Sequence, residues 1–255
     1  MNSDLLAILV LKLMLTGCWA SACSAAEEQT QAGLIDIKTV IPDVVLDLRY
    51  AGFHNFIGEP VTGYNLAKCL LTPQAAQQLA SVQQDLKAFS LSLKIYDCYR
   101  PQRAVDHFLR WAAVTDDTRM QQEFYPRRDK HNLFADGYIA AKSSHSRGST
   151  VDITLVPLPV PQQALYLPGQ PLQACDLEQS QRFQDNSLDM GTGFDCFDAL
   201  ANTENPRLGL AQRINRLLLK TLMEQHGFNN YALEWWHFTL VNEPFPDSYF
   251  DIAIE

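Results

Sequence analysis

Four side chains in two separate segments have the types needed for metal-dependent hydrolysis. His145 and Asp152 flank a glycine turn at Gly148, which can bring an imidazole and a carboxylate to one point. His237 would supply a third ligand, and catalytic zinc sites use three protein ligands and leave the fourth position to water. Glu234, three residues before His237, would then be the general base beside that water.

Taken singly, these residues are weak signals. A histidine near an aspartate is more often part of a surface hydrogen bond than a metal ligand, and the HExxH motif of common zinc proteases is absent from the sequence. The spacing also sets a condition, because an offset of three places Glu234 and His237 on opposite faces of an extended strand. The pair therefore requires a bend, a bulge or a strand end.

The segment Asp97-Cys98-Tyr99-Arg100-Pro101 adds a permanent cation to this set. Arg100 ends a predicted strand just before a predicted helix, and from there its side chain can face an active site. A structural salt bridge is the alternative for the same arginine. The sequence therefore makes Arg100 a candidate catalytic residue.

The elements that must position these residues are strands and helices in irregular alternation. Thr72 and Pro73 begin a predicted helix as N-cap and first-turn residue, and Pro101 begins another. Because the elements lack a regular βαβ period, the sequence predicts an α+β fold. The strands are expected within residues 35–51, 91–99, 151–156 and 231–241, and a third helix from about 207 to 226.

Two further segments have distinct patterns. Residues 157–187, here called the proline-rich segment, contain five prolines and are expected to form an ordered loop or insertion. In the third helix, one face is expected to be apolar and to pack on the core. The residues of that face are Ile214, Leu217, Leu218, Thr221 and Leu222.

The overall charge limits the classes of partner. The 255 residues include 20 basic and 29 acidic side chains, for a formal charge of −9. A phosphate backbone requires a concentrated basic surface, so nucleic acid is excluded as the main partner. Adhesion to an anionic membrane by charge alone is disfavoured for the same reason.

The N-terminal residues 1–26 resemble a secretory signal peptide, with an apolar stretch at residues 5–15 followed by small residues. The mature domain would then cover residues 27–255, exported to a bacterial periplasm or cell envelope. Leu15-Thr16-Gly17-Cys18 is similar to a lipobox, in which Cys18 would carry a lipid anchor and provide the sole membrane attachment. Ordinary cleavage after Ala22 or Ala25 is the alternative to lipidation at Cys18. For the apolar stretch itself, the alternative to a signal peptide is a buried helix of the mature domain.

Export would leave four cysteines in the mature chain for disulfide bonds. Cys175 and Cys196 flank one loop-rich stretch and form a natural local pair, and Cys69 and Cys98 then pair with each other. Four reduced, buried thiols are the alternative. The absence of a CxxC motif argues against a cysteine-ligated zinc site.

Several motifs together resemble one known family. The SxHxxGxxxD pattern in SSHSRGSTVDITL, the ending EWWHF and the preceding DCYRP are similar to those of the zinc D-alanyl-D-alanine dipeptidases. That family belongs with D,D-carboxypeptidases and hedgehog-type domains in one metallopeptidase superfamily. The resemblance runs from about Asp47 to Leu240 and includes DLRYA, HNFIGEPVTGY, CLLTPQAAQQLA and DMGTGFD. It implies one α+β domain with a central, mainly antiparallel sheet and flanking helices.

The resemblance also implies roles for individual residues. One Zn²⁺ per chain would be held by His145, Asp152 and His237, with Glu234 as catalytic base and Arg100 stabilising the oxyanion. The substrate would be D-Ala-D-Ala. Three residues would contact it: Asp189 would hold its free amino group, Ser143 would contact it or orient the ligand segment, and Tyr50 would line the pocket.

Two rival functions and three departures from the family pattern accompany this prediction. A zinc D,D-carboxypeptidase acting on peptidoglycan stem peptides is the nearest rival, and a non-catalytic zinc-bearing module is the other. Thr150 stands where alanine is usual and is expected to narrow the space behind the metal, and Cys98 stands where glycine is common. The proline-rich segment is longer than the family minimum, which puts the substrate range in question.

Overall fold

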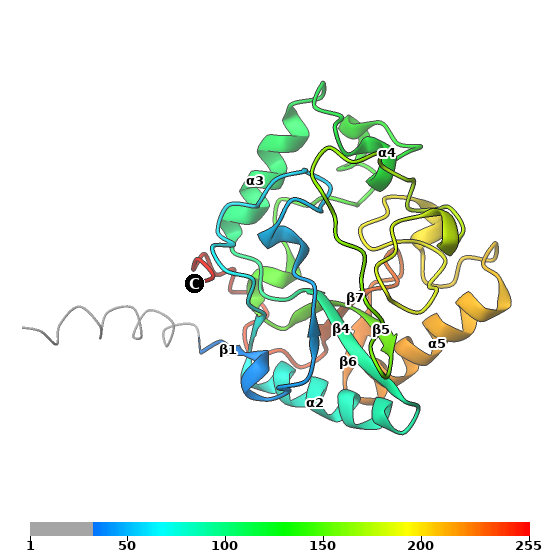
Figure 1. Cartoon of the computed structure of the whole chain (residues 1–255). Helices are drawn as coiled ribbons and strands as arrows, with labels where there is room; N and C mark the ends of the chain where they lie inside the picture. The colour runs from blue at the N-terminus through cyan, green and yellow to red at the C-terminus, as the bar shows by residue number, and fades with distance from the viewer. Residues whose placement is uncertain (1–32) are drawn as a thin grey trace, which may run out of the picture. The chain divides into compact units, whose positions relative to one another are not determined.

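A five-stranded sheet in the order β2-β4-β5-β7-β6 forms the centre of the described structure (Figure 1). Only the β2–β4 pair is parallel, and the other three pairs are antiparallel. The α+β prediction with a mainly antiparallel sheet is confirmed. The strands of this sheet are β2 (Val45–Leu46), β4 (Leu91–Asp97), β5 (Thr150–Pro157), β6 (Phe228–Asn230) and β7 (His237–Leu240). A separate antiparallel pair joins β1 (Ile35–Asp36) and β3 (Leu70–Leu71).

Helices cover the sheet on both sides. Helix α2 (Pro73–Lys87) begins where Thr72 Oγ1 accepts a hydrogen bond from Ala75 N, and it packs on β4. Helix α5 (Leu210–Gln225) packs on β6 and on α2, whereas α3 (Gln102–Ala113) and α4 (Gln121–Phe124) lie on the other side of the sheet (Figure 1). The 3₁₀ helices are η1 (Ile37–Thr39), η2 (Arg49–Ala51), η3 (Lys130–Asn132), η4 (Ser144–Arg147), η5 (Gln179–Gln181) and η6 (Ala199–Ala201).

The structure is a computed structural model that describes residues 33–255. Gly33–Glu255 forms a single unit. Among these residues no helix has both the length and the apolar character that crossing a bilayer requires. The predicted signal peptide at 1–26, with the lipidation site at Cys18, lies outside the described residues.

Two details of the predicted elements are wrong. The strand expected at 231–241 is confined to β7, because Tyr231 to Trp236 form a turn between β6 and β7. Only part of the expected apolar face of α5 packs on the core: Leu222 is buried and Leu218 partly buried, but Ile214 is 54% and Leu217 63% accessible. Arg216, on the opposite face, is buried. Arg216 is accepted in the core because its guanidinium donates to the carbonyls of Met190 and of the turn around η6.

A buried group of charges joins the proline-rich segment to the sheet. The side chain of Lys94 in β4 is fully buried, and its ammonium pairs with Asp47 Oδ2 at 3.1 Å. It also donates to Gln163 Oε1 at 2.6 Å and to the carbonyl of Asp185. Arg49 Nε donates to the same Asp47 carboxylate at 2.8 Å. The segment is thus an ordered loop fixed by hydrogen bonds to a buried ammonium group.

Replacing Asp47 by asparagine is expected to lower the free energy of unfolding by roughly 3 kcal/mol near neutral pH, because Lys94 would stay buried with part of its charge uncompensated. Burial alone would raise the pKa of Asp47, but Arg49 and Lys94 outweigh it and hold this pKa well below the usual 3.8. A depressed carboxyl pKa stabilises the fold above the unfolded-state value, and this contribution is lost as the pH falls below it. Urea unfolding should therefore show the difference between wild type and variant shrinking below about pH 4. An equal difference at neutral and acidic pH would contradict the charge argument.

Candidate active site

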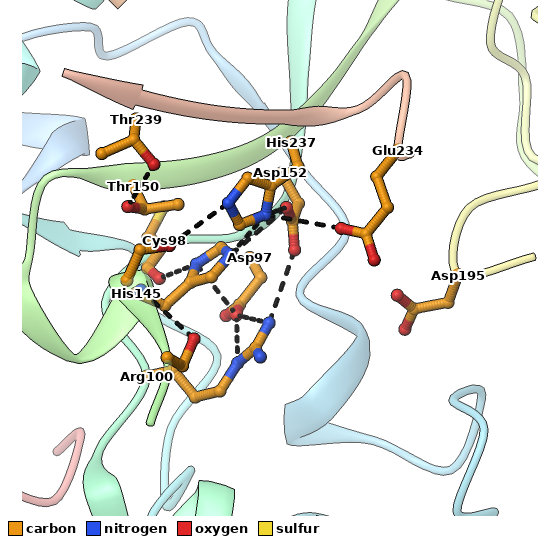
Figure 2. A network of polar contacts seen from close by, with 12 residues as sticks. Asp97, Cys98, Arg100, His145, Thr150, Asp152, Asp195, Glu234, His237 and Thr239 are labelled. Atoms are coloured by element: carbon orange, nitrogen blue, oxygen red, sulfur yellow. Dashed lines mark hydrogen bonds and ion pairs between the residues drawn. The ribbon is translucent and has the colours of Figure 1, made fainter. Parts of the chain in front are cut away.

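The side chains of His145, Asp152 and His237 converge on one point (Figure 2). His145 Nε2 lies 3.2 Å from His237 Nδ1 and 3.3 Å from Asp152 Oδ1. His237 Nδ1 lies 3.1 Å from the same Asp152 oxygen. The structure therefore brings the three predicted ligand residues together, each with one nitrogen or oxygen facing the others.

The nitrogen and oxygen atoms that face one another have the spacing that a tetrahedrally coordinated cation requires, and His145 has the required tautomer. Ligand atoms about 2.0–2.1 Å from such an ion lie about 3.3 Å from one another. The observed separations of 3.1–3.3 Å match this edge length. His145 Nδ1 is 2.7 Å from the carbonyl oxygen of Cys98, and because a carbonyl only accepts, Nδ1 carries the proton. The lone pair of His145 Nε2 then points at the cluster, so these residues fit a metal ion.

Strand register explains how residues distant in sequence meet. Asp97 of β4 is paired with Asp152 of β5, and Asp152 is paired with His237 of β7, so the three form a row across the sheet. His145 reaches the row from η4, which ends at Gly148 with φ 78°. The positive φ therefore requires glycine, and an added Cβ would also displace the end of the Leu34 side chain, whose Cδ2 would lie 2.5 Å away.

Two neighbouring serines hold the ligands in place. Ser143 Oγ accepts a hydrogen bond from the backbone N–H of His145 at 3.3 Å and so caps η4. Ser144 Oγ lies 3.2 Å from His237 Nε2, the ring nitrogen that faces away from the cluster. Sequence reasoning selected Ser143 and missed Ser144, although the two are adjacent. The signal was the second serine in SSHS, but only the fold shows that it reaches His237.

Ser144→Ala is expected to weaken metal binding by about tenfold, because His237 loses the partner that orients its ring. A matched control is Thr150→Ala, since the Thr150 hydroxyl lies 2.9 Å from Thr239 Oγ1 and not against a ligand. Competition with a chromophoric chelator measures both affinities. Equal affinities for Ser144→Ala and wild type would show that this contact does not orient the ligand.

Glu234 lies beside the cluster on the turn that precedes β7. His237 N donates to the Glu234 carbonyl at 3.2 Å, and this turn allows both side chains to face the site despite their offset of three. Glu234 Oε2 is 3.6 Å from His237 Nδ1. Burial raises the pKa of Glu234 to about 8, and the negative charges of Asp152 and Asp195 add to that effect. A nearby cation would lower this pKa, which suits a group that accepts a proton near neutral pH.

Arg100 both lines the site and forms a salt bridge. Its Nη2 is 2.9 Å from Asp97 Oδ2 and 3.5 Å from Asp152 Oδ2. The guanidinium also lies over the ring of Tyr50, 4.9 Å from the centroid. Arg100 therefore lies in the cavity wall, where a catalytic role would place it, and it also forms a salt bridge, in which Asp97 fixes the direction of the guanidinium. Asp97 Oδ2 is in addition 3.4 Å from His145 Nδ1. One carboxylate therefore contacts both the His145 ring and the Arg100 guanidinium.

Arg100, Glu234 and the three converging residues line a cavity of about 230 Å³. Aromatic and aliphatic side chains form much of its wall, and Lys142 also lines it. The cavity is smaller than the roughly 300–1,000 Å³ of sites for drug-sized ligands. Its other lining residues include Phe56, Val105, Phe108, Ile139, Phe197 and Tyr231.

The structure places Asp195, not Asp189, in this cavity. Asp189 is absent from the lining, and its carboxylate accepts hydrogen bonds from Arg182 at 2.7 Å and Gln212 at 2.9 Å. The structure therefore does not bring Asp189 to the cavity, where the predicted amine-binding role would require it, and other side chains already hold its carboxylate. Asp195 is six residues later in the same DMGTGFD segment, is 5% exposed and lines the cavity.

Tyr50 contributes through Asp195. Its hydroxyl donates to Asp195 Oδ2 at 2.8 Å, and its ring is part of the cavity wall. Burial raises the pKa of Asp195 to about 8, with the charge of Asp152 adding to the shift. Within residues 33–255 no basic side chain forms an ion pair with Asp195, and a buried carboxylate of this kind is favourably ionised when a cationic group binds beside it. Asp195 lies near Glu234 in the site (Figure 2), which therefore offers a place for an ammonium group.

Comparison with known proteins bears on what this site does. A family model described as D-Ala-D-Ala dipeptidase matches residues 30–159 and 173–255. The chain belongs to this family. A D-alanyl-D-alanine dipeptidase of Enterococcus faecalis is 35% identical over 222 residues, which cover 87% of this chain and 98% of the relative. Others from Streptomyces coelicolor and Escherichia coli are 35% and 30% identical, over 86% and 81% of this chain and 96% and 84% of the relatives.

Membership of the D-Ala-D-Ala dipeptidase family makes the chain a metallopeptidase, in keeping with its cluster of two histidines and an aspartate. The unmatched residues 160–172 lie inside the proline-rich segment, where the sequence predicts extra length. Thr150 does not line the cavity, and its hydroxyl lies 2.9 Å from Thr239 Oγ1. The structure contains the disulfides Cys69–Cys98 and Cys175–Cys196, not four free thiols.

Proposed function

We propose that this protein is a zinc-dependent dipeptidase that hydrolyses D-alanyl-D-alanine to two molecules of D-alanine. The observation that carries the proposal is the small cavity in which Glu234 and the three-ligand cluster share the wall with the buried Asp195. An amide bond beside the cluster and an ammonium group at Asp195 would suit a short substrate with a free N-terminus. The names of the relatives support this substrate.

One zinc ion per chain would be held by His145, Asp152 and His237. Two nitrogens and one oxygen in a three-ligand site are typical of catalytic zinc, which when bound polarises a carbonyl and lowers the pKa of water. The carbonyl of Cys98 orients the His145 ring, and the Ser144 hydroxyl orients the His237 ring, so both rings would face the ion.

Side chains of the cavity carry out proton transfer, oxyanion stabilisation and substrate binding. Glu234 takes a proton from the attacking water and passes it to the nitrogen of the leaving alanine. Arg100, held by Asp97, places positive charge where the oxyanion develops. Asp195, held by Tyr50, binds the substrate ammonium group. This contact sets the distance between the substrate N-terminus and the bond that is cleaved.

Metal removal tests the proposal directly. The protein treated with a chelator is expected to lose D-Ala-D-Ala hydrolysis, and stoichiometric Zn²⁺ is expected to restore it, because the three side chains alone cannot activate water. Release of D-alanine is the measurement, and N-acetyl-D-Ala-D-Ala is the comparison substrate. Preference for the acetylated compound would indicate a D,D-carboxypeptidase instead. Stoichiometric zinc without hydrolysis of any D,D-dipeptide would indicate a non-catalytic zinc-bearing module.

We further propose that residues 27–255 form the mature enzyme, exported to a bacterial periplasm or cell envelope and acting on dipeptide derived from peptidoglycan. The two disulfides support export, because such bonds persist in oxidising compartments. The apolar stretch and small residues of 1–26 support a signal peptide, with Cys18 as a candidate lipidation site. The intact mass of the protein purified from its host decides between a lipidated Cys18 and an unmodified N-terminus beyond it.

A further inference from the structure

The disulfide Cys69–Cys98 lies directly behind a metal ligand. The carbonyl of Cys98 accepts the hydrogen bond from His145 Nδ1 at 2.7 Å, and this bond fixes both the tautomer and the direction of the ring. The sulfur of Cys98 is bonded to Cys69, and the next residue is tied to the same segment by Tyr99 N donating to Leu70 O at 3.0 Å. Two neighbouring links therefore hold the carbonyl that orients His145.

The disulfide Cys175–Cys196 lies beside the amine-binding carboxylate. Cys196 follows Asp195, and on the other side of Asp195 the N–H of Gly193 donates to the carbonyl of Cys175 at 2.8 Å. Cys175 thus holds the chain on both sides of Asp195. Asp195 itself has φ 56°, in the left-handed region that is costly for a residue with a Cβ. Such a conformation persists where flanking contacts impose it.

Each disulfide is anchored away from the other. Cys69 N-terminally adjoins β3, and its carbonyl accepts from Ile37 N at 2.9 Å. Cys175 belongs to the proline-rich segment, and its N–H donates to the carbonyl of Glu123 at 3.0 Å. All four cysteines are 3% exposed or less, so both disulfide bonds are buried inside the protein. The metal-ligand half and the amine-binding half of the cavity are held by different bonds.

We propose that the two disulfides are separate positioning devices, Cys69–Cys98 for metal affinity and Cys175–Cys196 for recognition of the substrate ammonium group. The second role rests on the proposed function, because it requires Asp195 to bind an amine. Loss of a disulfide also stabilises the unfolded chain, so both variants unfold at a lower temperature. What distinguishes positioning from stability is that the two losses act on different functional quantities.

Two paired variants, Cys69→Ala/Cys98→Ala and Cys175→Ala/Cys196→Ala, test the proposal, each serving as control for the other. The first is expected to raise the Zn²⁺ dissociation constant about tenfold, as the loss of an outer contact to a ligand does. At saturating zinc its KM for D-Ala-D-Ala stays at the wild-type value. The second is expected to keep the wild-type zinc affinity and to raise KM about tenfold, as weakening of a charged hydrogen bond does, while kcat changes little.

Chelator competition gives the zinc constants, steady-state kinetics give KM and kcat, and thermal unfolding shows that each variant is folded at the assay temperature. Serine pairs replace the alanine pairs where folding fails. Parallel changes of zinc affinity and KM in both variants, in proportion to lost stability, would overturn the proposal. If the wild type hydrolyses no dipeptide, the proposed function fails. The zinc constants alone then decide, since equal effects of both pairs on zinc binding overturn the separation.

Discussion

Replacing Glu234 by glutamine is expected to lower kcat for D-Ala-D-Ala by about 10²–10⁴-fold, the range that a positioned general base contributes. The amide keeps the size of the side chain but cannot accept the proton of water. Glu234 is half-buried beside His237 and is not one of the three converging residues, so the variant should keep its metal. The loss should therefore appear in turnover and not in zinc content.

Zinc stoichiometry and kcat measured on the same preparation check this result. Glu204→Gln is a suitable control, because that carboxylate is exposed, pairs with Lys220 and does not line the cavity. Near-normal turnover by Glu234→Gln would remove Glu234 from the mechanism. Loss of zinc together with activity would mean that Glu234 helps to hold the ion.

Removing the carboxylate of Asp195 is the second change with a large expected effect. Asp195→Ala should lower kcat/KM for D-Ala-D-Ala by about 30-fold or more, since losing one partner of a buried charge pair costs roughly 2–5 kcal/mol. The physical reason is that the substrate ammonium would enter the cavity without a counter-ion. Activity on N-acetyl-D-Ala-D-Ala, which has no such charge, should fall much less.

Asp189→Ala is the matched control, because it removes a carboxylate from the same DMGTGFD segment. Its partners are Arg182 and Gln212, and it does not line the cavity. We expect Asp189→Ala to lower thermal stability and to leave the preference for a free amino group intact. If Asp189→Ala abolished that preference and Asp195→Ala did not, the assignment made from the structure would be reversed.

The choice between Asp189 and Asp195 could not be made from the sequence. The segment containing both could be identified as part of the site, but the choice between them depends on side-chain partners. Asp189 is held by residues 7 positions before and 23 positions after it, and Asp195 is directed inward by a left-handed backbone and by Tyr50. None of these contacts has a local pattern in the sequence.

The convergence of His145, Asp152 and His237 was predictable for the opposite reason. His145 and Asp152 are joined by a short turn at Gly148, so the spacing itself carries the geometry. His237 and Glu234 required a bend, and the turn before β7 provides it. The face of α5 was not predictable, because the buried Arg216 is satisfied by carbonyls of distant loops, which a periodicity of apolar residues cannot reveal.

The row of Asp97, Asp152 and His237 across β4, β5 and β7 has a consequence for folding. These strands are far apart in the chain, so the row exists only after two long-range strand pairings have formed in the correct register. A slip of one residue would turn a ligand to the opposite face of the sheet. A cation that binds this row therefore adds stability to the completed sheet and not to partly paired or misregistered intermediates. Metal binding would thus selectively stabilise the native strand register.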